Sequence, residues 1–174
     1  EAQAQELGGY ESPEGLKFWL DQPPNAERNL AFRNSGDLQF ESVGSHWGLD
    51  HLGVSFGAAM GDLDGDGDLD LVVNNYEEPA GIYRNDVSTG HRIKIRLVGS
   101  ASNKWGIGAM VRLETSAGPQ VRYLTLARGV MSADEPLVHF GLGSQETIDR
   151  LSVHWPSGRV QEFEKLAADR FYTI

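Results

Sequence analysis

Residues 61–70 read Gly-Asp-Leu-Asp-Gly-Asp-Gly-Asp-Leu-Asp, and they lead directly into the apolar run Leu71-Val72-Val73. Carboxylates therefore occupy positions 1, 3, 5, 7 and 9 of a loop that starts at Asp62. Calcium accepts about six to eight oxygen ligands in a loosely specified geometry, and such a loop can curl around it. Glycine at position 6 permits the sharp turn. We predict that the loop binds Ca²⁺ through the following residues: Asp62, Asp64, Asp66, Asp70 and, through its main-chain carbonyl, Asp68.

Three other interpretations of this loop were weighed. Magnesium fits less well, because it demands stricter octahedral geometry and keeps its waters. An EF-hand requires a glutamate at position 12, where this chain has Val73, and the β-branched run after Asp70 favours a strand over a helix. A solvated acidic turn without an ion is the remaining alternative, but its closely spaced carboxylates would repel one another.

Composition excludes several classes of function. The chain has 174 residues, 40% of them hydrophobic, and a formal net charge of −10, which argues against binding to nucleic acid or to an anionic membrane surface. It has no cysteine, so disulfides, zinc–thiolate sites and thiol catalysis are excluded. No apolar run reaches the roughly 20 residues of a membrane span. The start at Glu1-Ala2-Gln3 indicates a processed protein or a fragment of a longer one.

Short alternating apolar runs bounded by Gly, Asn, Asp and Pro predict an all-β protein with antiparallel sheets. In residues 92–97, Arg-Ile-Lys-Ile-Arg-Leu, the alternation is strict. The predicted strands are 39–43, 54–60, 69–74, 81–84, 92–98, 110–115, 121–127, 137–140, 148–155, 159–163 and 171–174. His139 and His154 are expected to pair across a sheet face, and Trp155 to pack in the core because it alternates with Leu151 and Val153.

A short sequence unit occurs once on each side of the acidic loop. The aromatic-Arg-Asn unit at residues 32–34 recurs at 83–85, displaced by 51 residues, which is consistent with a repeat architecture. Residues 54–74 resemble an FG-GAP (VCBS-type) repeat, whose D-x-D-x-D-G-x-x-D loop is matched by Asp62, Asp64, Asp66, Gly67 and Asp70. Residues 29–37, Asn-Leu-Ala-Phe-Arg-Asn-Ser-Gly-Asp, also resemble an element of that family. This resemblance implies a blade of a β-propeller, although a propeller needs about 4–8 blades and only one full repeat is present.

The C-terminal half has a resemblance of its own. Residues 91–174 are similar to the ASPIC/UnbV domain, which follows FG-GAP repeats in cartilage-acidic-protein-like proteins and in exported bacterial proteins. The matching elements are Ile-Gly-Ala at 107–109, Val-His-Phe-Gly-Leu-Gly at 138–143 and Val-His-Trp-Pro-Ser-Gly-Arg-Val-Gln at 153–161. We therefore predict three parts: an N-terminal segment 1–27, with the last strand of a preceding blade as its candidate role, an FG-GAP-type calcium-binding repeat 28–88, and a β-sandwich-like domain 91–174.

The predicted function is that of an exported, non-catalytic binding or adhesion module with a structural Ca²⁺ ion, located outside the cell or in the periplasm. Extracellular calcium modules bind with Kd of about 10⁻⁴–10⁻³ M, which suits those compartments. A protein or a glycan at the cell surface is the expected partner, and exposed sheet edges favour self-association. A carbohydrate-binding accessory module, with Trp47 or Trp105 stacking on sugar, and the C-terminal fragment of a larger enzyme are the alternatives.

Overall fold

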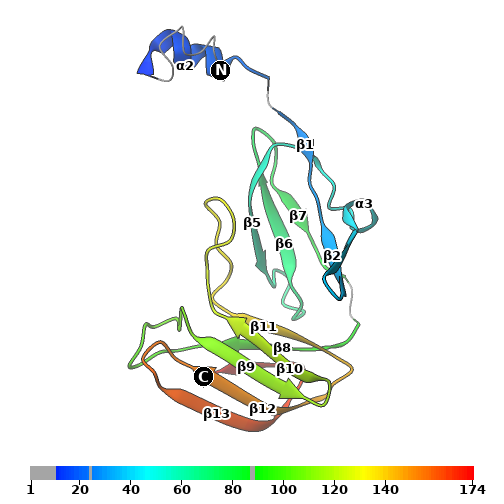
Figure 1. Cartoon of the computed structure of the whole chain (residues 1–174), viewed down its shortest axis with the longest axis vertical. Helices are drawn as coiled ribbons and strands as arrows, with labels where there is room; N and C mark the ends of the chain where they lie inside the picture. The colour runs from blue at the N-terminus through cyan, green and yellow to red at the C-terminus, as the bar shows by residue number, and fades with distance from the viewer. Residues whose placement is uncertain (1–10, 24, 87–88) are drawn as a thin grey trace. The chain divides into compact units, whose positions relative to one another are not determined.

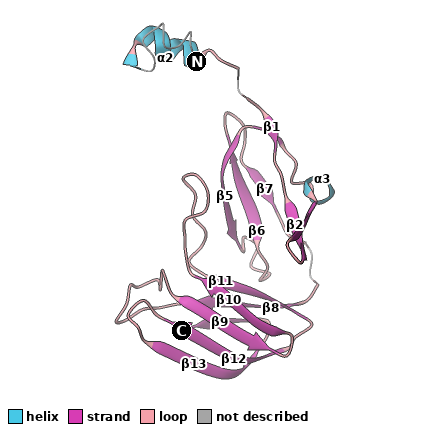
Figure 2. Cartoon of the chain, in the orientation of Figure 1, coloured by secondary structure: helices cyan, strands magenta, loops and turns pink. Residues whose placement is uncertain are grey.

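The structure, a computed structural model, describes residues 11–23, 25–86 and 89–174. They divide into two compact units, Glu1–Val54 and Ser55–Ile174, coloured blue to cyan and green to red in Figure 1. The first unit combines short strands with two short helices, and the second unit is built from strands (Figure 2). Strands prevail over the described residues as a whole, so the predicted all-β class is confirmed. The division between the units falls inside 28–88, and the three-part organisation predicted from the sequence stays a prediction. Residues 1–10 of the predicted N-terminal segment and residues 87–88 lie outside the described residues.

The first unit holds short elements with little buried surface. They are α2 (Pro13–Leu20), β1 (Glu27–Arg28), β2 (Phe32–Gly36), β3 (Gln39–Ser42), α3 (Gly44–Trp47) and β4 (Leu52–Gly53). Strand β1 pairs with β4 and β2 pairs with β3, both antiparallel. Asp37 and Leu38 form the tip of the β2–β3 hairpin with φ of 48° and 60°, the backbone that two-residue hairpin turns require.

Within the predicted N-terminal segment, residues Pro13–Leu20 form helix α2. The side chain of Ser12 accepts a hydrogen bond from the Gly15 amide at 2.9 Å, and Pro13 occupies the first turn, where it needs no hydrogen-bond acceptor. These local signals start the helix. Among the described residues of this segment, only Glu27 lies in a strand.

The second unit contains a three-stranded sheet and two sheets of the C-terminal domain. The first is the antiparallel sheet β5 (Ser55–Gly61), β6 (Asp70–Asn75) and β7 (Gly81–Tyr83). The C-terminal sheets have the orders β10-β9-β12-β13 and β11-β8-β14. Their strands are β8 (His91–Arg96), β9 (Met110–Thr115), β10 (Gly118–Tyr123), β11 (Val138–Gly143), β12 (Thr147–His154), β13 (Val160–Ala167) and β14 (Arg170–Thr173).

A single apolar core is shared by the strands of these two C-terminal sheets. Its fully buried side chains include Ile93 and Ile95 from β8, Leu113 from β9, Phe140 from β11 and Leu151 from β12. The alternation of these strands buries every second residue and leaves the polar residues outside. Trp155 belongs to this core, as predicted, and its indole N–H donates to Gln161 Oε1 at 2.6 Å.

Three local expectations differ from the structure. The predicted strand 121–127 is displaced to Gly118–Tyr123, because the tight turn after β9 sets the register of β10. Strand β14 pairs with β8 in parallel, whereas antiparallel pairing was expected. His139 and His154 do not pair across one sheet face, because β11 and β12 belong to different sheets.

Candidate metal centre

The acidic stretch forms the connection between β5 and β6. Gly61 and Asp70 are the last residues that pair across these two strands, so residues 62–69 form the loop. The apolar run from Leu71 continues as β6 because its side chains pack within the sheet, as the sequence indicated. The two antiparallel strands bring Asp62 and Asp70, at opposite ends of the loop, close together.

Three of the five predicted ligands form a group that could hold a metal ion. One carboxylate oxygen from each of Asp62, Asp64 and Asp70 lies within 4.8 Å of the others. Asp70 is buried, Asp62 is half-buried and Asp64 is exposed, so one side of the group is open to solvent. Carboxylate oxygens in this arrangement are the ligands of hard cations such as calcium.

The loop backbone is held by its own aspartate side chains. Asp62 accepts hydrogen bonds from the Gly65 amide at 2.8 Å and the Gly67 amide at 3.1 Å. Asp64 accepts from the Asp66 amide at 3.2 Å. These bonds turn the backbone back on itself, and the turn uses left-handed φ values of 81° and 99° at the two glycines.

Asp70 anchors the loop at its C-terminal end. Its side chain is among the fully buried ones, with 2% of its surface exposed. One oxygen accepts from the Leu63 amide and the other from the Asn85 amide, both at 2.8 Å. Asp70 therefore ties both the start of the loop and the chain that follows β7 to the first residue of β6.

Asp66 and Asp68 lie outside the three-carboxylate group. Asp66 accepts from the Asp68 amide at 3.0 Å and lies 3.9 Å from the Arg92 guanidinium. Asp68 is only 6% exposed, and no hydrogen-bond donor among the described residues reaches either of its carboxylate oxygens. Burial, followed by the charge of Asp66, raises the pKa of the Asp68 carboxyl. A buried carboxylate without a hydrogen-bond donor next to this acidic group fits a bound cation. Ligation by Asp68 through its main-chain carbonyl stays a prediction.

The C-terminal domain contributes three side chains that the sequence analysis did not place at the loop. The ammonium group of Lys94 contacts Asp62 Oδ2, and Arg92 donates to the Asp66 carbonyl at 2.5 Å. The His139 side chain lies near the Gly67 backbone, and its Nε2 atom is buried without a hydrogen-bond partner among the described residues. The alternating cations of β8 were visible in the sequence, but only the packing of the second unit shows that they face the loop.

These contacts alter the acidity of the site. Burial alone would raise the pKa of Asp62, but hydrogen bonds from Lys94 and the loop amides, with the charge of Lys94, hold it below its usual value. Burial lowers the pKa of His139, and nearby positive charges lower it further. The Gly67 backbone acts in the opposite direction but does not reverse the shift. His139 is therefore neutral at pH 7, and Asp62 is ionised.

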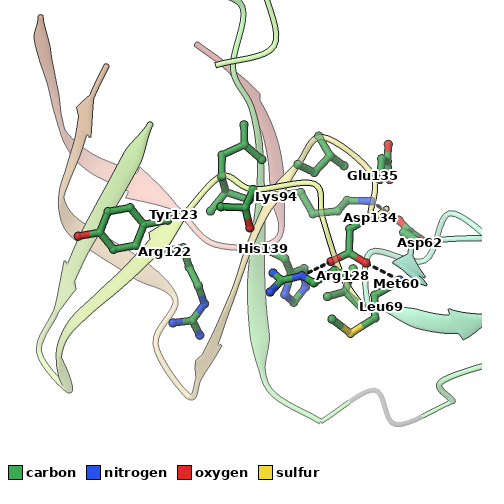
Figure 3. Close-up of a pocket in the computed structure, with 14 residues that line it drawn as sticks. Met60, Asp62, Leu69, Lys94, Arg122, Tyr123, Arg128, Asp134, Glu135 and His139 are labelled. Atoms are coloured by element: carbon green, nitrogen blue, oxygen red, sulfur yellow. Dashed lines mark hydrogen bonds and ion pairs between the residues drawn. The ribbon is translucent and has the colours of Figure 1, made fainter. Parts of the chain in front are cut away.

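A cavity of about 150 Å³ lies beside the contact between Lys94 and Asp62 (Figure 3). Asp62, Lys94 and His139 line one part of its wall, and the ion pair of Arg128 with Asp134, at 2.7 Å, lines another. Asp134 also accepts from the Met60 amide at 2.9 Å, which connects the segment between β10 and β11 to β5. The cavity is thus formed where the three-stranded sheet meets the C-terminal domain.

Comparison with known proteins identifies the class of both regions. Residues 18–73 match the FG-GAP-like repeat, and residues 99–174 match the family described as ASPIC and UnbV. The chain therefore carries an FG-GAP-like repeat followed by an ASPIC/UnbV domain, as the sequence resemblance predicted.

The curated relatives of this chain include cartilage acidic protein 1 from three vertebrates. This chain is 29% identical to the Homo sapiens and Mus musculus proteins over 132 residues, which are 74% of this chain and 20% of each relative. It is 30% identical to the Xenopus tropicalis protein over 143 residues, 79% of this chain and 22% of the relative. The chain spans about one fifth of the length of these proteins. Within the described residues, no helix is long and apolar enough to cross a membrane.

Proposed function

We propose that this chain is an exported, non-catalytic binding or adhesion module in which Ca²⁺ stabilises the β5–β6 loop. The observation that carries the proposal is the group of Asp62, Asp64 and Asp70 oxygens within 4.8 Å, next to the orphaned carboxylate of Asp68. Asp66, the fifth predicted ligand, would complete the coordination through the same loop. The relation to a protein named for cartilage supports an extracellular location and a partner at the cell surface or in the matrix.

The ion would act on stability rather than on chemistry. Several carboxylates in one loop repel one another, and a divalent cation removes that repulsion while it bridges the two ends of the loop. Because the unfolded chain has no preformed site, the free energy of calcium binding adds to the free energy of unfolding. The rigid loop would then support a neighbouring binding surface.

Isothermal titration calorimetry tests the metal. We expect the purified chain, stripped of metal, to bind one Ca²⁺ with Kd of about 10⁻⁴–10⁻³ M and to bind Mg²⁺ more weakly. Asp64→Ala should abolish the binding, whereas Asp149→Ala, which removes an exposed aspartate from β12, should leave it unchanged. The absence of calcium binding in the parent chain would contradict the proposal.

A carbohydrate-binding accessory module is the second candidate, because two tryptophans expose about half of their surface. Trp47 is 52% exposed and Trp105 is 46% exposed, and the Lys104 ammonium lies 5.2 Å from the centre of the Trp105 ring. Such exposed indoles can stack on sugar rings. A glycan array distinguishes the two candidates: glycan binding that Trp105→Ala or Trp47→Ala removes would favour this one.

A further inference from the structure

The side chain of Lys94 is held against the proposed calcium loop by a different part of the fold. Lys94 lies on β8, the first strand of the C-terminal domain, and its ammonium contacts Asp62, one of the three clustered carboxylates (Figure 3). The Lys94 side chain is 18% exposed and that of Asp62 is 4% exposed. The two charges therefore interact in a largely desolvated environment, where their attraction is much less screened than at a surface.

The position of Lys94 is set by the core beneath it. Ile93 and Ile95, its neighbours on β8, are 1% and 0% exposed, so the strand cannot slide or rotate without opening the core. The ring of Phe171, on the neighbouring strand β14, lies 5.7 Å from the ammonium. Arg92, two residues earlier, donates to the Asp66 carbonyl. The domain thus presents a fixed cationic edge to the loop.

Lys94 and a metal ion would use the same carboxylate. Both oxygens of Asp62 already accept hydrogen bonds from loop amides, and Oδ2 also receives the ammonium. A calcium ion bound by Asp62 would therefore have to displace the ammonium or tolerate a positive charge beside it, and each of these weakens binding. Without the ion, the ammonium supplies part of the missing positive charge and keeps the loop folded.

We propose that Lys94 is a built-in competitor of calcium, which couples occupancy of the loop to its contact with the C-terminal domain. This inference rests on the proposed calcium site and adds its regulation. Because coupling between two contacts is reciprocal, calcium weakens the Lys94–Asp62 contact by the same factor by which that contact weakens calcium binding. The affinity is thereby kept low, so that the loop responds to calcium at extracellular concentrations.

Calcium titrations of charge variants test the coupling. Lys94→Met keeps the length of the side chain and removes its charge, and we expect it to bind Ca²⁺ about 5- to 150-fold more tightly than the parent. Its melting temperature in EDTA should fall, since the metal-free loop loses its internal cation. Lys94→Arg should keep the weaker affinity. Lys104→Met, which removes a cation beside Trp105, should change neither quantity.

The outcomes separate this inference from the proposed function. If the parent and Lys94→Met bind calcium equally, or if the variant binds more weakly, the competition is overturned while the calcium site stands. If only Lys94→Met binds, Lys94 blocks the site and the competition is supported, but the parent chain lacks the calcium binding that the proposed function requires. If neither binds, both proposals fail. Should Lys94→Met not fold, nitrogen-15 NMR of the lysine side chains in the parent decides: calcium must shift the Lys94 signal selectively, and an unchanged signal refutes the coupling.

Discussion

Replacing Asp70 by alanine should destabilise the protein even when no calcium is present. Its buried carboxylate accepts two backbone hydrogen bonds, from Leu63 and from Asn85, both at 2.8 Å. Hydrogen bonds to charged groups contribute about 1.5–3 kcal/mol each, so the loss of both amounts to about 3–6 kcal/mol. For a chain of this size, such a loss lowers the melting temperature by about 6–24 °C.

The matched variant is Asp64→Ala, which removes a carboxylate from the same group. Asp64 is exposed, and among the described residues it accepts one hydrogen bond, from the Asp66 amide at 3.2 Å. In EDTA we therefore expect it to cost less than about 1 kcal/mol. In saturating calcium both variants should lose the stabilisation by the ion, which is about 2.7 kcal/mol at one hundred times Kd.

Urea and thermal unfolding of both variants, followed by circular dichroism with and without EDTA, measure these differences. Asp70→Asn serves as a further control, because its amide oxygen can replace only one of the two acceptors and should give an intermediate loss. If Asp70→Ala and Asp64→Ala lose the same stability in EDTA, the two hydrogen bonds of Asp70 do not stabilise the fold, and its role would be limited to the metal.

Two further predictions concern Gly67 and His139. Gly67→Ala should lower the free energy of unfolding by about 1–3 kcal/mol, because φ there is 99° and a Cβ would lie 3.0 Å from Arg92 Nε. Gly65→Ala, where φ is 81° and a Cβ would meet open space, should lower it less. A urea melt of each variant measures the difference. Three cationic side chains add to burial in lowering the pKa of His139: Arg92, Lys94 and Arg122. Below pH 6.5 the His139 imidazole therefore binds a proton more readily in the unfolded chain than in the folded chain. The free energy of unfolding in EDTA should fall as the pH drops below about 6.5, by at most about 1.4 kcal/mol per pH unit. His139→Asn should flatten that dependence, and parallel curves for the two proteins would contradict the assignment.

Local patterns in the sequence were sufficient for the all-β class and for most strands. Strand β9 was predicted with its bounds, and β5, β6 and β12 within one residue, because alternation of apolar and polar residues is a property of each strand alone. The acidic loop was predicted in the same way, because its carboxylates and glycines lie in one continuous stretch of the sequence. Helix α2 also has a local signal, in Ser12 and Pro13, which the sequence analysis did not use.

Tertiary structure alone decided which residues surround the loop and how its aspartates divide their roles. Asp62, Asp64 and Asp70 come together because β5 and β6 pair, while Asp68 turns into a buried position without a hydrogen-bond donor among the described residues. Lys94 lies 32 residues from Asp62 in the chain. The parallel pairing of β14 with β8 brings Phe171 beside Lys94. The physical reason is the same in each case. Spacing along the chain determines which residues share a strand face, but packing between distant segments determines which charges meet and how strongly water screens them.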